Sequence, residues 1–291
     1  MSDPQANTLS RRRFLKTMLR AGATGTALIA AGGAYSTWLE PHWLSIETVS
    51  IPLRRLPPQF AGFTLAQISD VHRSLYVAEA DIRAAVEAVN RLTPDVVVLT
   101  GDFVTNDAAL AESCAPVLGA LQARSGVYAI LGNHDHWTNA DEVERALQTQ
   151  PITVLRNAAV PIERDGARLW IAGVDDVWEH HADLDRALRL VPAAQTTILL
   201  AHEPDYADLA VQYPIDLQLS GHSHGGQVRL PFFGSPVLPH LGRKYPHGLY
   251  QLGPLQLYTN RGLGVISPPV RFNCQPEITL LTLRVSSTDR S

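Results

Sequence analysis

Histidine, aspartate and asparagine recur along this 291-residue chain at one kind of place, directly after a short apolar run. Such side chains are costly to bury unless a partner satisfies them. A single cluster would be interpreted as a turn, a cap or a hydrogen-bonded core histidine, whereas five at successive strand ends favour a bound cation. The clusters are Asp70-x-His72, Gly101-Asp102, Gly132-Asn133-His134-Asp135, His202 and Gly221-His222-Ser223-His224.

The residue types in these clusters restrict which ion they can hold. Imidazole, carboxylate and amide ligands without a thiolate suit Mn²⁺, iron or Zn²⁺. Seven candidate ligands are too many for one tetrahedral ion, and they suit two divalent ions about 3.5–4 Å apart that share a bridging carboxylate. Proteins use this arrangement for phosphoryl transfer, so the pattern predicts metal-dependent phosphoryl-transfer chemistry.

Apolar runs and helical periodicity between the clusters predict the elements that position them. Ile82, Val86 and Val89 share one helix face, and the wholly apolar run 96–99 predicts a strand covered on both sides. The predicted strands are 63–68, 96–99, 127–131, 169–174, 197–200 and 217–219, then 227–230, 255–258 and 278–283. The predicted helices are 78–92, 108–122, 141–148, 182–190 and 205–211. This order predicts an α/β fold of two mixed sheets packed together with helices outside, and its ligands are expected beyond the carboxyl ends of the strands.

The five clusters, complete and in order, resemble the signature of the calcineurin-like metallophosphoesterases. The resemblance extends over residues 45–285 and implies a four-layer α/β/β/α sandwich with two divalent ions bridged by Asp102. It assigns one metal to Asp70, His72, Asp102 and His224, and the other to Asp102, Asn133, His202 and His222.

The sequence beyond the ligands resembles a bacterial branch of exported or membrane-associated phosphoesterases, in segments 221–234, 261–264 and 270–277. That branch implies phosphodiester hydrolysis, and it includes enzymes tied to a lipid-linked pyrophosphate, UDP-2,3-diacylglucosamine. Apolar residues between 230 and 245, together with Trp38 and Trp43, suit a site that faces a membrane surface. We therefore expect a phosphodiester or pyrophosphate substrate that carries acyl chains.

Five further residues complete the predicted site. His134 is predicted to lie near the phosphate, as a general acid or as a stabiliser of negative charge. Asp135 is predicted to hold His134 in the required tautomer. His240 and His247, in a loop rich in Pro and Gly, are predicted substrate contacts. Arg261 is predicted either to bind phosphate or to fix its loop through backbone carbonyls, and the same two roles are open to Arg271.

The N-terminus differs in kind from the rest of the chain. Residues 10–16 read Ser-Arg-Arg-Arg-Phe-Leu-Lys and precede an uncharged stretch, 21–39, rich in Ala, Gly and Thr. This pattern is typical of an export signal and matches the twin-arginine consensus, although a basic amphipathic helix on the fold is the alternative. We interpret 1–34 as a signal to the periplasm or the outer face of the cytoplasmic membrane, either cleaved after Ala34 or retained as an anchor. A linker (35–45), the metallophosphoesterase domain (46–285) and a tail (286–291) are expected to follow.

The net charge of the chain argues against one class of partner, nucleic acid. Without residues 1–34, 19 Lys and Arg face 27 Asp and Glu, a formal charge of −8. Such a domain gains nothing from attraction to a phosphate backbone, so nucleic acid is not an expected partner and a nuclease is disfavoured. The expected partners are the phosphoester substrate, the twin-arginine export machinery and a membrane surface. The alternatives are a phosphomonoesterase acting on small soluble substrates, or a catalytically silent metal-bound surface protein.

Overall fold

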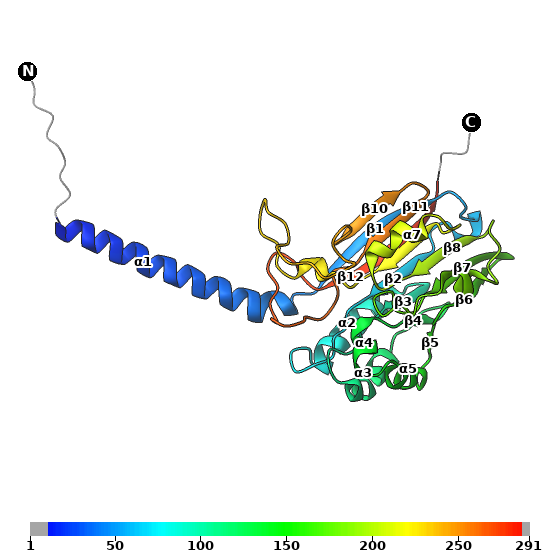
Figure 1. Ribbon diagram of the computed structural model, residues 1–291, viewed down its shortest axis with the longest axis horizontal. Coiled ribbons are helices and arrows are strands. Elements are labelled where there is room, and N and C mark those ends of the chain that lie inside the picture. The colour runs from blue at the N-terminus through cyan, green and yellow to red at the C-terminus, as the bar shows by residue number, and fades with distance from the viewer. Residues whose placement is uncertain (1–10, 287–291) are drawn as a thin grey trace, which may run out of the picture.

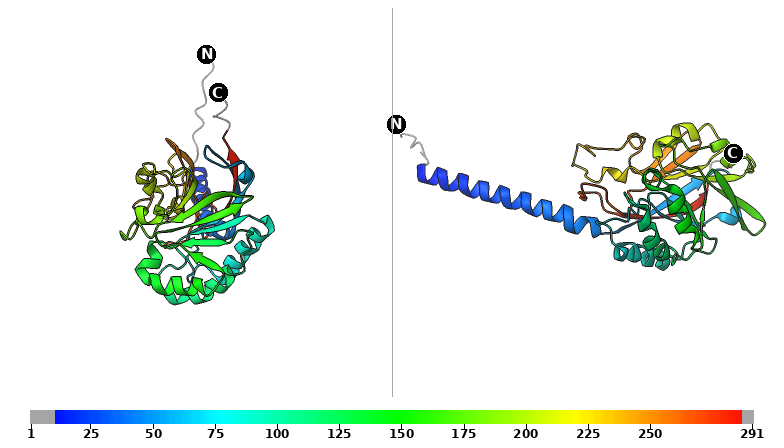
Figure 2. Two further views of the ribbon diagram at one scale, coloured as in Figure 1. Left: turned by 90° about the vertical axis from the view of Figure 1, so that its right-hand side faces the viewer. Right: turned by 60° about the horizontal axis from the view of Figure 1, so that its bottom comes forward.

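Strands that are apolar on both faces need packing partners on both sides, and this requirement organises the fold. The computed structural model describes residues 11–286, and in it the fully buried strands β3 (Val96–Thr100) and β8 (Thr196–Leu200) lie inside two separate sheets. Each of these sheets has six strands among the described residues, and they pack face to face as two layers (Figures 1 and 2).

The first sheet has the strand order β1-β12-β2-β3-β4-β5. Strands β2 to β5 run parallel, β12 runs antiparallel to β2, and β1 runs parallel to β12. The carboxyl ends of β2, β3 and β4 therefore meet at one edge. The bounds of the other five strands are β1 Ser45–Leu53, β2 Thr64–Ile68, β4 Val127–Ile130, β5 Ile152–Val154 and β12 Glu277–Val285.

The second sheet has the strand order β10-β11-β9-β8-β7-β6, in which β7, β8, β9 and β11 are parallel. Strands β6 and β10 are antiparallel to their neighbours at the two edges. The bounds of the remaining strands are β6 Ala158–Arg164, β7 Ala167–Gly173, β9 Leu217–Ser220, β10 Gly248–Leu252 and β11 Leu255–Thr259.

Three clusters of buried apolar side chains fill the three interfaces between four layers. The middle cluster, which includes Leu65, Ile171 and Leu217, joins the two sheets. Helices α2 (Glu79–Leu92), α3 (Ala111–Leu118) and α5 (Ala140–Gln148) cover the first sheet, and α6 (Leu184–Leu188) and α7 (Ala207–Ala210) cover the second (Figure 1). The predicted α/β/β/α sandwich is therefore confirmed.

Several local predictions differ from the structure. Segment 227–230 is not a strand, because its pairing is limited to the isolated bridges Val228↔Phe272 and Leu230↔Gly234 in the described chain. The predicted helix 108–122 begins as a 3-10 turn, Ala108–Leu110, and α3 ends at Leu118, one residue before Gly119. Strands β5, β6 and β10 and the short helix α4 (Asn133–Thr138) carry too few periodic residues to be recognised from the sequence.

The N-terminal segment projects away from the sandwich as helix α1 (Arg11–Ala34), which has no buried residue (Figures 1 and 2). Among residues 11–286, no helix combines the length and apolar character that a membrane span requires. A π-helical turn (Tyr35–Leu39) and a 3-10 turn (Glu40–His42) follow and are tied to the domain. The Arg271 N–H donates to the Ser36 carbonyl (2.9 Å), and the buried Glu40 carboxylate accepts from the Cys274 N–H. Ser10, the first residue of the predicted motif, lies outside the described residues.

Candidate metal centre

Five parallel strands deliver polar side chains to one place at their carboxyl ends. Asp70 follows β2, Asp102 follows β3, Asn133 follows β4, His202 follows β8 and His222 follows β9. The loops that carry them hydrogen-bond to one another: Asp70 N–H donates to the Gly101 carbonyl (3.0 Å), and Gly221 N–H donates to the His202 carbonyl (3.0 Å). The centre is therefore built where the two sheets meet.

The backbone at this centre is held in an uncommon conformation. Five of the seven predicted ligands have φ between 50° and 66°, in the left-handed region: Asp70, His72, Asp102, His222 and His224. Non-glycine residues adopt this region at a cost, and they do so mostly at functional sites. The packing is also close, because a Cβ at Gly221 would lie 1.8 Å from Ser69 Oγ and 2.3 Å from Asp70 Oδ2.

One group of ligand atoms consists of Asp70, His72 and His224, whose side chains are all buried. The two imidazole Nε2 atoms lie 3.0 Å apart, and His224 Nε2 lies 3.3 Å from Asp70 Oδ1. Two imidazole nitrogens that face each other at this distance, beside a carboxylate, form a pocket of lone pairs that a cation would satisfy.

A second group consists of Asp102, His202 and His222, also buried. Asp102 Oδ2 lies 3.1 Å from His202 Nε2 and 3.4 Å from His72 Nε2, so this carboxylate stands between the two groups. Its other oxygen, Oδ1, accepts from the His134 N–H (2.8 Å). This is the placement that a bridging ligand requires.

Neighbouring acceptors fix the orientation of the imidazoles. His202 Nδ1 faces the Thr100 carbonyl (2.6 Å), and His222 Nε2 faces the His240 carbonyl (2.7 Å). A ring nitrogen that donates to a carbonyl leaves the other nitrogen as a lone-pair donor, which is how ligating histidines are oriented in metal sites. Each of these two histidines therefore presents its second nitrogen to the centre.

Burial and charge set His72, His222 and Asp102 in the states that bind cations, whereas burial raises the pKa of Asp70 to about 6 and the neighbouring carboxylates raise the pKa of His202 despite its burial. Burial lowers the pKa of His72 and of His222 to about 3, so these imidazoles are neutral at pH 7. Burial works to raise the pKa of Asp102, but His202 beside it outweighs burial and holds that pKa well below its usual value. The Asp102 carboxylate is therefore ionised.

Asn133 tests whether the site fits a metal. It is buried, and within the described chain its Oδ1 has no hydrogen-bond partner. Leaving a buried amide oxygen unsatisfied is costly, and a cation is a partner that removes this cost. Both chain neighbours of Asn133 lie close to Asp102. A Cβ at Gly132 would lie 2.4 Å from Asp102 Oδ1, and the His134 N–H donates a hydrogen bond to the same oxygen. Carboxylate, imidazole and amide donors together suit divalent Mn, Fe or Zn.

His134 lies at the edge of this centre, but Asp135 does not orient it. His134 packs edge-to-face on His72 with ring centroids 4.8 Å apart, and its Nδ1 faces the Thr105 carbonyl at 2.7 Å. That carbonyl, rather than Asp135, selects the tautomer, and the predicted role of Asp135 is wrong. The Asp135 carboxylate is instead buried among four backbone N–H donors, those of Asp102, Phe103, Val104 and Gly132.

Arg261 also differs from its prediction. Its guanidinium pairs with the carboxylates of Glu277 on β12 and Glu47 on β1, so it neither binds its loop's carbonyls nor presents its charge to the centre. The fully buried Arg271 performs the carbonyl role, because it donates to the carbonyls of Cys274, Arg261, Gly262 and Gly264. Its charge thereby holds together the loop that leads into β12.

His240 and His247 lie on the loop between β9 and β10. The His240 carbonyl accepts from His222, and its ring packs edge-to-face on Trp178 at 5.3 Å. His247 is half-buried, and burial together with Arg229 and Arg261 lowers its pKa. Contact of either histidine with substrate stays a prediction.

Sequence reasoning missed Trp178 and the two carboxylates that precede it in the loop after β7. Trp178 lies edge-on to Trp137 (5.2 Å) and to His222 (5.5 Å), and Trp137 lies against His134 (4.7 Å), so two indoles line the rim between His134 and His222. Asp175 and Asp176, which precede Trp178, are also buried. They follow an apolar strand as Asp70 and Asp102 do, and that signal could have found them.

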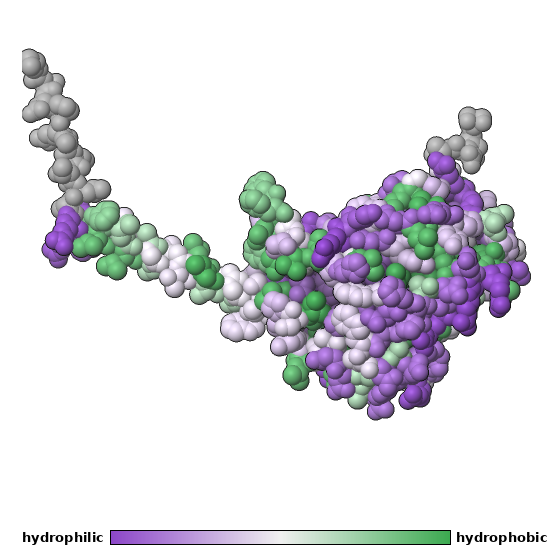
Figure 3. All heavy atoms as spheres, in the orientation of Figure 1, coloured by the Kyte–Doolittle hydropathy of each residue, from purple (hydrophilic) through white to green (hydrophobic). Residues whose placement is uncertain are grey.

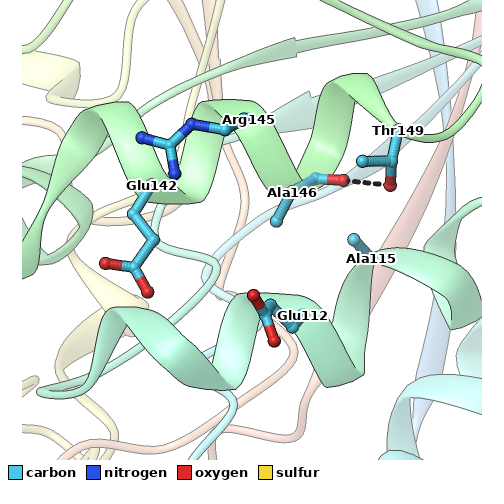
Figure 4. A pocket seen from close by; sticks show the side chains of 6 residues that line it. All are labelled: Glu112, Ala115, Glu142, Arg145, Ala146 and Thr149. Atoms are coloured by element: carbon cyan, nitrogen blue, oxygen red, sulfur yellow. Dashed lines mark hydrogen bonds between the residues drawn. The ribbon is translucent and has the colours of Figure 1, made fainter.

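Two cavities test where the centre opens. A cleft of about 750 Å³ borders His134 and Trp137, and its other lining residues include Thr105, Asn106, Asp107 and Asn139. We call it the polar cleft. A smaller cavity of about 240 Å³ lies between α3 and α5 and is lined by Glu112, Ala115, Glu142, Arg145, Ala146 and Thr149 (Figure 4). None of the seven predicted ligands lines either cavity in the described part of the chain, but the polar cleft reaches His134 at the edge of the centre.

Comparison with known proteins gives this geometry a context. The family model described as calcineurin-like phosphoesterase matches residues 63–226. The uncharacterized metallophosphoesterase YkuE of Bacillus subtilis is 39% identical over 280 residues, 95% of this chain and 98% of that protein. The phosphodiesterase YaeI of Escherichia coli is 32% identical over 282 residues, 94% of this chain and 99% of that protein. The Haemophilus influenzae NAD nucleotidase shares the fold, with a TM-score of 0.50 at 16% identity over 70% of this chain and 46% of that one.

Proposed function

The chain belongs to the calcineurin-like phosphoesterase family as a metal-dependent phosphoester hydrolase, and from this premise we propose that it is an exported phosphodiesterase with two divalent ions. The substrate is a phosphodiester or a pyrophosphate, and its class is a lipid-linked ester such as UDP-2,3-diacylglucosamine. A relative that carries the name phosphodiesterase, 32% identical over nearly its whole length, supports the reaction.

One observation carries the proposal: the ligand atoms of two groups converge on Asp102. Its Oδ2 lies within 3.4 Å of an imidazole nitrogen from each group. Asp70, His72 and His224 would hold one ion with Asp102, and Asn133, His202 and His222 would hold the other. Mn, Fe and Zn suit these donors.

The chain's own residues orient the ester and handle protons. Divalent ions in such a site neutralise phosphate oxygens and lower the pKa of a water. His134 borders both the ligands and the polar cleft, so its imidazole can hydrogen-bond an ester oxygen. With Nδ1 donating to the Thr105 carbonyl, the nitrogen that remains is Nε2, which carries a proton for an ester oxygen when the ring is the imidazolium. His134 therefore serves as the general acid, or stabilises negative charge on the leaving oxygen.

The test of the reaction is hydrolysis of bis(p-nitrophenyl) phosphate by the full-length protein. We expect release of p-nitrophenol after loading with Mn²⁺ and its loss after chelation. Assaying p-nitrophenyl phosphate in parallel separates a diesterase from a monoesterase. Protein that retains two bound metals and hydrolyses neither ester would identify a silent metal-bound protein instead.

The arrangement of the N-terminal segment supports the proposed export and the proposed contact with a membrane surface. Arg11, Arg12 and Arg13 begin helix α1, which extends from the domain without buried residues (Figure 1). Exposed apolar side chains gather where α1 joins the domain, on the turn that follows it and on two loops (Figure 3). They are Trp38, Trp43, Leu75, Phe232 and Phe233. Aromatic side chains of this kind favour membrane interfaces.

Relative kinetics test the substrate class. Because the domain is acidic, charge does not draw an anionic substrate, and apolar contact together with the ions must bind it. We expect a higher kcat/KM for a lipid-linked diester or pyrophosphate than for a soluble monoester or nucleotide. Kinetics that favour the soluble monoester would overturn the lipid-linked substrate and leave the metal centre unaffected.

A further inference from the structure

A third cavity borders the ligands His222 and His224 and has no lining residue in common with the polar cleft. Its volume is about 340 Å³, within the range of small-molecule sites, and it also borders Ser223 and Gly226 of the ligand loop. The remaining wall is mainly apolar and comes from two loops. It includes Val228, Val237, Pro239, Ile266, Pro268 and Val270. We call it the apolar cavity.

The wall of the apolar cavity is held by hydrogen bonds that satisfy backbone polar groups of its two loops. The Gln227 side chain accepts from the Ile266 N–H (2.8 Å) and donates to the carbonyls of Ile266 and Pro268 (both 3.3 Å). On the other loop, the Ser235 hydroxyl donates to the Gly225 carbonyl (2.6 Å). These bonds occupy polar groups of the two loops, and most of the remaining lining side chains outside the ligand loop are apolar.

The two cavities reach the centre at different residues, His134 for the polar cleft and His222 with His224 for the apolar cavity, and they differ in chemistry. The polar cleft offers His134 and the side chains of Asn106, Asp107 and Asn139. The apolar cavity offers aliphatic and proline side chains beside the ligands His222 and His224. A phosphoester bound at the centre therefore meets polar groups for one substituent and apolar groups for the other. The wall of the apolar cavity also continues, through Val237, into the loop that exposes Phe232 and Phe233.

We propose that the apolar cavity binds an alkyl or acyl chain of the phosphoester, with Val237, Ile266 and Val270 as the residues that determine specificity. The proposal rests on the phosphodiesterase function above and deepens it to an amphiphilic ester, with its polar substituent in the polar cleft. Burying each methylene of the chain in a preformed apolar cavity strengthens binding, until the cavity is filled.

The first experiment measures chain-length dependence. The substrates are methyl, hexyl and decyl p-nitrophenyl phosphate, each below its critical micelle concentration so that aggregation plays no part. For the wild-type full-length protein loaded with Mn²⁺ we expect KM to fall by up to about fourfold for each methylene that is buried. A KM that does not change with chain length would overturn the proposal.

Variants locate the effect. Val237→Asp and Ile266→Asp place a carboxylate in the wall, and Val237 is 75% exposed, so its replacement is compatible with folding. We expect both variants to lose the chain-length dependence, measured within each variant as the ratio of kcat/KM for the decyl ester to kcat/KM for the methyl ester. Leu190→Asp, at an exposed apolar position outside the cavity lining, is the matched control and should keep the dependence. Equal dependence in wild type and both wall variants would contradict the assigned site.

A binding measurement separates this proposal from the proposed function. Calorimetry compares decylphosphonate with methylphosphonate on the same full-length protein. We expect at least tenfold tighter binding of the decyl compound to wild type, and about equal binding of the two compounds to Ile266→Asp. Preference for the decyl chain without hydrolysis of any ester would support the cavity while the enzyme function failed. Hydrolysis of bis(p-nitrophenyl) phosphate without a preference for the decyl chain would support the enzyme function and overturn the proposed role of the apolar cavity.

Discussion

The two oxygens of Asp102 have different partners, and this division is the basis of its predicted role. Oδ2 faces His72 and His202, whereas Oδ1 accepts from the His134 N–H. One carboxylate thus contributes charge to both groups of ligands and holds the backbone beside Asn133.

Asp102→Asn is expected to lose both metals and all measurable phosphodiesterase activity. An amide supplies no shared negative charge to the two ions, and its NH₂ would face imidazole lone pairs. Elemental analysis of purified protein measures the metals. Asp165→Asn, in an exposed turn, is the control and should bind as wild type does. Two metals still bound to Asp102→Asn would refute the bridge.

His134→Ala is expected to keep its metals while kcat falls about 10²–10⁴-fold, as for the loss of a general acid–base group. The side chain is not among the seven ligands and its Nδ1 faces a carbonyl, so its removal leaves the ligand atoms in place. Steady-state kinetics at saturating substrate measure the effect. A smaller loss for an ester with an activated leaving group would point to the acid role, and an unchanged kcat would exclude any role in the chemical step.

At the scale of elements, two carboxylates hold the loops that present the ligands. Asp135 at the start of α4 accepts from backbone N–H groups of the β3 loop and of its own loop. Asp175 after β7 accepts from His136 Nε2 (2.8 Å) on α4 and from Arg156 Nε (2.8 Å) after β5. The first joins neighbouring loops of one sheet, and the second joins the loops of both sheets.

Asp135→Ala is expected to lower the free energy of unfolding by about 3 kcal/mol or more, because four buried backbone N–H groups lose their acceptor. Urea unfolding in the presence of a chelator measures this without a contribution from metal binding. If Asp135 acted only through His134, stability would be unchanged and kcat alone would fall.

Asp175→Asn is expected to destabilise the protein by about 2 kcal/mol at pH 7. Burial works to raise the pKa of Asp175, but hydrogen bonds from His136 and Arg156 outweigh it and lower that pKa to about 2. A carboxylate with a depressed pKa stabilises the fold above its unfolded pKa of about 4, and this contribution is lost as pH falls towards 2.

The urea midpoints of wild type and Asp175→Asn should therefore differ at pH 7 and converge as pH falls from about 4 towards 2. Asp141→Asn is the matched control, because Asp141 pairs with the same Arg156 but its side chain is 78% exposed. An exposed ion pair contributes about 0–1 kcal/mol. A loss in Asp175→Asn that does not change with pH would show that packing, rather than charge, is responsible.

At the scale of the whole molecule, helix α1 and the sandwich are joined by a segment that is packed on the domain rather than extended. Ser36 and Glu40 bind the loop that contains Arg271 and Cys274. The same region exposes Trp38 and Trp43. A signal that directs export of the folded protein is compatible with this arrangement, since the ligands come from loops that require the complete fold.

Replacing Arg11 and Arg12 together with Lys is expected to strand the precursor in the cytoplasm, because the twin-arginine pair is the part of the motif that its export machinery reads. Cell fractionation and immunoblotting of a tagged full-length chain measure the distribution. Arg20→Lys, further along α1, is the control and should be exported normally. Normal export of the double variant would mean that the motif was misinterpreted.

Much of this protein could be predicted from its sequence because local rules decide it. Apolar strands followed at once by Asp, Asn or His predict both the sheets and the place where their ligands meet, since parallel strands present their carboxyl ends at one edge. Asp70, Asp102 and His202 are brought together in this way. The same rule applied to Asp175 would have extended the prediction to the loop after β7.

Tertiary structure alone decided which partner each remaining side chain has. Asp135 and the Thr105 carbonyl are both near His134, and the fold assigns the His134 Nδ1 to the carbonyl. Arg261 is paired with Glu47, 214 residues away, and Gln227 closes the wall of a cavity made by a distant loop. Hydrogen bonds and ion pairs of this kind depend on distances of a few ångströms between segments far apart in the chain. Residue type and periodicity therefore determine that these groups need partners, and the packing of two sheets determines which partners they receive.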